Sequence, residues 1–189
     1  SVFARFSGAH FNPLVSIAER LVGRQCTRLT AAYVVVQVAG ALVGVLIAHG
    51  MFDVSLLQAS TKVRTGAAQW FAEGVASFGL LLVIGLSAKE SAATVAARVA
   101  CFIGAAYWFT ASTSFANPAV TLARAFTDSF AGIRIDDVPM FAQIGMGRYL
   151  PKHVDYARFL APADYMRRFR DAAFVVERFL TPVTRSVIR

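Results

Sequence analysis

Two Asn-Pro pairs are the residues of this sequence best placed to do chemistry. Asn12-Pro13 follows Ser-Gly-Ala-His-Phe at residues 7–11, and Asn117-Pro118 follows Ser-Phe-Ala at residues 114–116. Asn is favoured at the N-cap of a helix, and Pro is tolerated at the first helical position because its missing N–H would have no partner there. The Asn amide also supplies donor and acceptor capacity without charge. Each pair therefore predicts a helix start that presents a neutral hydrogen-bonding group.

The elements around these pairs are two short helices and three longer apolar stretches. Short helices are predicted at residues 12–22 and 120–126, which are too short to cross a bilayer. Spanning helices are predicted at residues 29–50, 67–88 and 92–111. The first of these has 22 residues, and at a rise of about 1.5 Å each it matches a hydrocarbon core of about 30 Å. The arginines after residue 19 and the Lys-Glu turn at residues 89–90 place those ends in the cytoplasm, and the loop 51–66 outside.

Composition supports a membrane protein. The chain has 189 residues, of which 57% are hydrophobic and 16% are charged, whereas a soluble domain carries about 25% charged residues. The net charge is +8, and nine of the 19 Lys and Arg residues lie in the last 42 positions. No basic-aromatic pattern of the usual nucleic-acid modules is visible. The excess of basic residues in cytoplasmic segments of membrane proteins explains the charge better than nucleic acid does.

The two halves of the chain read as copies. Asn117 lies 105 positions after Asn12, and Gln37 and Gln143 lie 25 and 26 positions after the respective Asn. Three predicted spans separate the two pairs, and because three is odd, the second short helix enters the membrane from the opposite face. The sequence thus predicts an inverted repeat whose half-helices meet near the bilayer midplane.

The twin pairs and their flanking residues resemble the double Asn-Pro-Ala signature of the aquaporin, or major intrinsic protein, family over residues 7–145. The second copy is intact, and the first reads Asn-Pro-Leu. The resemblance implies an all-α membrane protein with an aquaporin-like inverted repeat, incomplete here, with three full spans and two re-entrant half-helices. The two spans that precede the first copy in the family are absent, and no sixth span is recognisable after Gln143. The chain is therefore expected to be a fragment.

The same resemblance implies a passive channel for water and small uncharged solutes, in the bacterial inner membrane and homotetrameric in its complete form. Two half-helices that point their N-terminal N–H groups at the pore centre concentrate positive potential there, which repels cations and protons. Water-selective members carry His and Arg at the first and last of three mapped filter positions, where this chain has small or apolar residues. These small or apolar residues imply a wider pore mouth, suited to glycerol-like polyols or metalloid hydroxides. The implied pore-motif residues are Asn12, Pro13, Leu14, Asn117, Pro118 and Ala119, and the filter residues are Ala105, Ser114 and Val120.

Three polar residues are expected to support the loops. Glu73, in the second span, resembles a family Glu that accepts hydrogen bonds from backbone N–H groups of the re-entrant loop, and this role is preferred to a proton relay. His10 is expected to hydrogen-bond within the first loop, because metal ligation would need partners that the spacing does not supply. Gln37, like Gln143, is expected to join helices rather than to bind solute.

Other function classes receive less support. No nucleophile elbow, phosphate loop or paired catalytic carboxylates are visible, so no enzyme and no cofactor are expected. Cys26 and Cys101 lack partners at metal-ligand spacing. Residues 1–145 are expected to form a partial channel domain, and 146–189 a basic, non-spanning tail, read either as frame-shifted disordered sequence or as an amphipathic segment on the membrane surface. Since the family pore needs six spans, the alternative to a channel is a non-conducting remnant or assembly subunit.

Overall fold

A computed structural model of the chain describes residues 3–145, and every regular element within that range is helical. The basic tail predicted at residues 146–189 lies outside the described residues. The elements are α1 (Ala4–Ser7), α2 (Pro13–Leu21), α3 (Thr27–Met51), α4 (Ala67–Leu86), α5 (Ala92–Phe109), α6 (Pro118–Ala123), the 3-10 turns η1 (Arg124–Phe126) and η2 (Ile135–Asp137), and α7 (Val138–Gly145).

Within residues 3–145, helices α3, α4 and α5 are the three elements long and apolar enough to cross a membrane, with 25, 20 and 18 residues. They correspond to the three predicted spans, with ends that differ by a few residues. The hydroxyl of Ser91 caps α5 by accepting the N–H of Thr94 at 3.2 Å, which fixes where the helix begins after the Lys89 turn. The prediction of three spans is confirmed.

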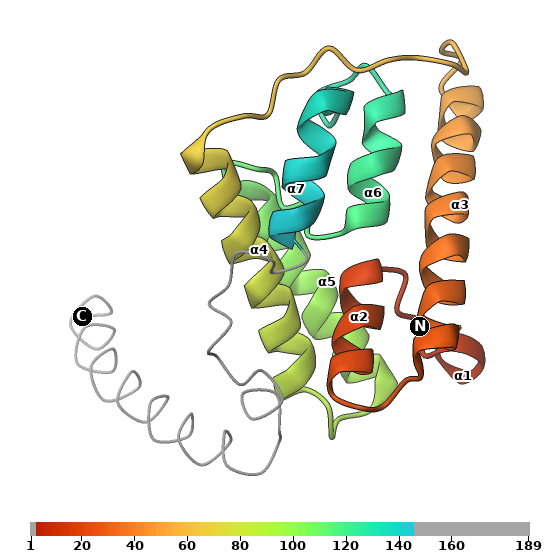
Figure 1. The fold of residues 1–189 in the computed structure, drawn as a ribbon, viewed down its shortest axis with the longest axis vertical. Coiled ribbons are helices and arrows are strands. Elements are labelled where there is room, and N and C mark those ends of the chain that lie inside the picture. Colours follow the sequence, from red (N-terminus) through yellow and green to blue (C-terminus); the bar gives the residue numbers. More distant parts are fainter. Residues whose placement is uncertain (1–2, 146–189) are drawn as a thin grey trace, which may run out of the picture.

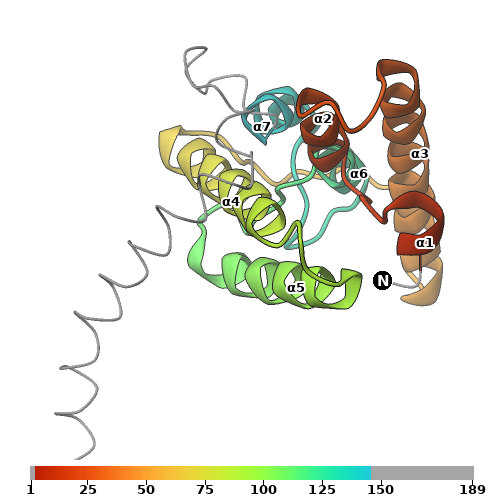
Figure 2. The ribbon, with the colours of Figure 1, turned by 90° about the horizontal axis from the view of Figure 1, so that it is seen from below.

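The two short helices lie end to end in the middle of the molecule. Figure 1 shows α2 and α6 between α3 on one side and α4 and α5 on the other, with their N-termini facing each other at mid-height. Seen from below, α2 covers α6, while α3 and the α4–α5 pair stand apart on either side (Figure 2). Contacts join α2 and α6 to α3, and α7 to α6 and α4. Because α2 and α6 run in opposite directions away from their meeting point, the predicted inverted arrangement is present.

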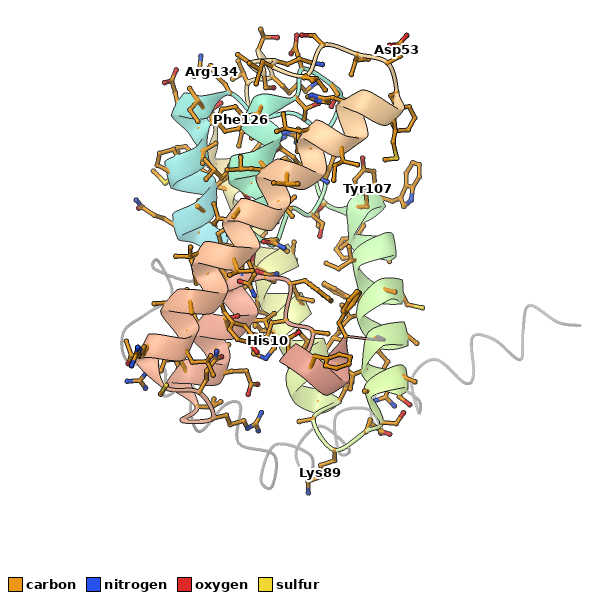
Figure 3. All side chains as sticks on the ribbon, turned by 90° about the vertical axis from the view of Figure 1, so that its right-hand side faces the viewer. His10, Asp53, Lys89, Tyr107, Phe126 and Arg134 are labelled. Atoms are coloured by element: carbon orange, nitrogen blue, oxygen red, sulfur yellow. The ribbon has the colours of Figure 1, made fainter. Side chains whose placement is uncertain are left out.

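The two ends of the molecule differ in what they carry. The turn with Lys89 lies at one end, and Asp53, Phe126 and Arg134 lie at the other, called here the Lys89 end and the Asp53 end (Figure 3). Most of α3 is apolar and exposed, with Val36 and Ile47 at 69% and 57% exposure. Such a surface suits a helix surrounded by hydrocarbon rather than water.

Two apolar clusters hold the second loop and α6 in place. The first consists of Phe115, Ala125, Ile133, Val138 and Phe141, and the second of Ala76, Leu80 and Ala116. Helices α4 and α5 approach closely because Gly79 has no side chain, and a Cβ there would overlap the ring of Phe102. The loop before Asn117 is therefore packed from both sides.

Candidate functional site

Asn12 and Asn117 are the N-caps of α2 and α6. Each has an extended backbone, with Pro at the next position. The side-chain oxygen of Asn12 accepts the N–H of Leu14 at 2.9 Å, and that of Asn117 accepts the N–H groups of Ala119 and Val120 at 3.1 and 3.3 Å. The helix-start prediction is confirmed for both pairs.

The two Asn side chains also join the loops to each other. Asn12 Nδ2 donates to the carbonyl oxygen of Ala116 at 2.7 Å, and Asn117 Nδ2 donates to that of Phe11 at 2.9 Å. Each Asn thus bonds the residue that precedes the other. Since an amide NH2 group has two donors, one N–H of each Asn remains without a protein partner among residues 3–145.

The backbones of the two loops repeat the same unusual conformation. In both, the residues one, three and four positions before the Asn have positive φ, between 44° and 64°. Left-handed backbone is uncommon for residues other than Gly, and it clusters at functional sites. The repeated positions are Gly8, Ala9 and Phe11 in the first loop and Thr113, Ser114 and Ala116 in the second. The internal repeat therefore extends from the sequence to individual backbone angles.

Glu73 lies beneath the second loop and is fully buried. Its carboxylate accepts the N–H of Ala116 at 2.5 Å and that of Phe115 at 3.2 Å. Hydrogen bonds to a carboxylate are among the stronger ones in proteins. Glu73 thus holds two consecutive backbone N–H groups of the second loop.

Ser16 connects the other two predicted support residues. The hydroxyl of this fully buried serine lies 3.1 Å from His10 Nδ1 and accepts from Gln37 Nε2 at 3.0 Å. The contacts tie the first loop to α2 and α3. Partial burial lowers the pKa of His10, against a smaller opposing effect of Glu19.

The three mapped filter positions lie on different elements. Ala105 is exposed on α5, and Val120 is partly exposed in the first turn of α6. Ser114 is 5% exposed, and its hydroxyl has no partner in the described part of the chain. None of these three side chains is large.

Sequence reasoning did not find Arg64, which is 3% exposed in the loop between α3 and α4. Its guanidinium donates to the carbonyl oxygens of Gly132, Phe130 and Ser112 at 2.7, 3.0 and 3.1 Å. Its backbone N–H donates to Asp137 at 2.8 Å. Arg64 therefore fastens three loops together, and no local pattern around it marks this role.

Metal-binding potential is low in this part of the chain. Between residues 3 and 145 no three His, Cys, Asp or Glu side chains gather in a way that could hold a metal ion. Cys26 and Cys101 are free and exposed.

Comparison with known proteins agrees with this geometry. Residues 1–137 match the family model of the major intrinsic proteins. The chain is 55% identical over 141 residues to aquaglyceroporin AqpS of Rhizobium meliloti (strain 1021), a match that covers 75% of this chain and 60% of that protein. The chain therefore spans somewhat less than two thirds of the curated relative. No solved structure matches significantly. With most of its length matched by the family model, the chain belongs to the major intrinsic protein family.

Proposed function

We propose that this segment forms the centre of a passive channel for water and small uncharged solutes. The observation that carries the proposal is the pair of Asn amides, each with its oxygen bonded to its own helix and one N–H left free. Two neutral donors held at the meeting point of two helix N-termini can bind a hydroxyl oxygen. The same helix ends disfavour cations.

The solute class follows from the filter positions. Ala105, Ser114 and Val120 would leave a wider and less polar opening than His and Arg, which favours glycerol-like polyols or metalloid hydroxides over strict water selectivity. The name of the related protein, an aquaglyceroporin, supports solutes of this kind.

We further propose where the channel lies, how it assembles and which of its ends faces the cytoplasm. Residues 1–145 would form the channel domain in the inner membrane, as part of a homotetramer, and residues 146–189 a basic tail. The Lys89 end would face the cytoplasm, because Arg20 in the last turn of α2 and Arg24 just after it are basic as well.

Stopped-flow light scattering on vesicles that contain the full-length protein tests the proposal. Water and glycerol gradients should collapse faster than in empty vesicles, and Asn117→Ala should slow both, because it removes a free donor, the cap of α6 and the bond to Phe11. Lys89→Ala, in the exposed turn between α4 and α5, is the matched control and should conduct normally. Permeability no higher than that of empty vesicles would reject the channel and favour a non-conducting assembly subunit.

A further inference from the structure

Two arginines lie beside the loop that carries Asn117. Arg64 is the buried residue that fastens three loops. Arg124 follows Val120 by four residues, and residues four apart on a helix lie on the same face, one turn from each other. Arg124 is thus one turn further toward the Asp53 end than the last mapped filter position.

Both guanidinium groups stack on one aromatic ring. The guanidinium carbons of Arg64 and Arg124 lie 4.7 Å and 4.2 Å from the centre of the Phe115 ring. Phe115 directly follows Ser114, so the two cations flank the filter segment of the second loop. Tyr107, two residues past Ala105 on α5, lies in the half of the molecule nearer the Asp53 end (Figure 3).

The positive charge of this pair is only partly compensated. Within residues 3–145, neither guanidinium has a carboxylate within the 4.0 Å of an ion pair. Glu73 attracts both from further away, but it is one carboxylate against two cations. Asp137 is paired with Arg134 at 3.3 Å, and the other described acidic residues of the Asp53 end are exposed, where water and salt screen them.

We propose that Arg64 and Arg124 exclude cations from the pathway at the Asp53 end, a task that Val120 cannot perform. The inference rests on the proposed channel function. A fixed charge roughly 10 Å from a permeating cation, at an effective dielectric constant of about 20, lowers the local cation concentration roughly tenfold. Uncharged solutes are unaffected, so the pair would combine a wide opening with low cation leak.

The test measures K⁺ flux, water permeability and glycerol permeability in the same preparation of vesicles carrying the full-length protein. Arg124→Gln removes one charge, and because the Arg124 side chain makes no hydrogen bond in the described structure, the loops should stay in place. K⁺ flux should rise roughly tenfold, with water and glycerol permeability unchanged. Arg124→Lys should keep K⁺ flux low. Arg64→Gln should also raise K⁺ flux. Arg134→Gln should not, because Arg134 lies at the same end but its charge is already paired with Asp136 and Asp137.

The outcomes separate this inference from the channel itself. An Arg124→Gln protein that passes glycerol normally and leaks no more K⁺ than the original overturns the inference and leaves the channel standing. An equal rise of K⁺ flux in Arg134→Gln overturns the inference as well, because any arginine at the Asp53 end would then exclude K⁺ as effectively as Arg64 and Arg124. A parent protein that passes neither water nor glycerol removes the proposed function and this inference together. If Arg64→Gln fails to fold, the Gln and Lys variants at Arg124 decide alone.

Discussion

Asn12 should stabilise the fold twice, as the cap of α2 and as the bridge to the second loop. Loss of an N-cap costs about 1 kcal/mol. Loss of the bridge leaves the carbonyl of Ala116, a fully buried residue, without this bond, and an unsatisfied buried acceptor costs about 1–3 kcal/mol. Asn12→Ala is therefore expected to lower the free energy of unfolding by about 2–4 kcal/mol.

Two further variants separate these contributions. Asn12→Ser keeps a good capping residue that is too short to reach Ala116, so it should lose the bridge alone, about 1–3 kcal/mol. Ser91→Ala removes a cap that makes no bridge, at the exposed start of α5, and should cost about 1 kcal/mol. The measurement is reversible denaturant unfolding in detergent micelles, with all variants compared under one set of conditions.

The order of the three losses tests the reasoning. If Asn12→Ser is as stable as the parent, the bond between Asn12 and Ala116 contributes nothing to the fold. If Asn12→Ala costs no more than Ser91→Ala, Asn12 is an ordinary cap, and the argument that the two loops stabilise each other fails.

Three other changes have defined outcomes. Val120→Arg should lower the ratio of glycerol to water permeability in the same vesicles, because a guanidinium adds bulk and fixed donors at the filter; an unchanged ratio would mean that Val120 does not line the opening. Glu73→Gln should reduce both permeabilities by roughly tenfold or more, since one buried N–H of the second loop loses its acceptor, whereas the exposed Glu90→Gln should have no effect. The pKa of His10 is lowered from 6.5 by burial, so the folded state favours the neutral ring. Its contribution to stability is complete above pH 6.5 and decreases as the pH falls toward the folded pKa; unfolding at pH 8 and pH 5 should show this loss, and His10→Gln should reduce it.

The features predicted from the sequence were those with a local cause. The Asn-Pro pairs specify helix starts through the side chain of Asn and the fixed φ of Pro, so α2 and α6 begin at the Pro of each pair. Length and apolar composition specified the three spans. The odd number of spans between the pairs gave the opposite directions of α2 and α6.

The features that the sequence did not reveal depend on contacts between distant segments. Arg64 contacts residues 48 and 68 positions away, and a single arginine in a polar loop has no pattern that indicates burial. The partner of each Asn amide is a backbone carbonyl, which every residue possesses. The positive φ angles of Phe11 and Ala116 could not be predicted from the sequence either, because neither Phe nor Ala favours this conformation.

The reciprocal bonds between the two loops have a consequence for synthesis of the protein. The bonded residues are 104 and 106 positions apart in the chain, and a ribosome that adds about 5–20 residues per second needs roughly 5–20 s to deliver the second partner. Until then the amide of Asn12 has no protein acceptor, and an unsatisfied polar group in hydrocarbon costs several kcal/mol. In a chain without other cysteines, Asn12→Cys should react quickly with a water-soluble maleimide when translation is arrested before residue 116 has left the ribosome, and more slowly once it has. The first half-helix would then remain in contact with water until its partner arrives, and the centre of the molecule would assemble in one late step.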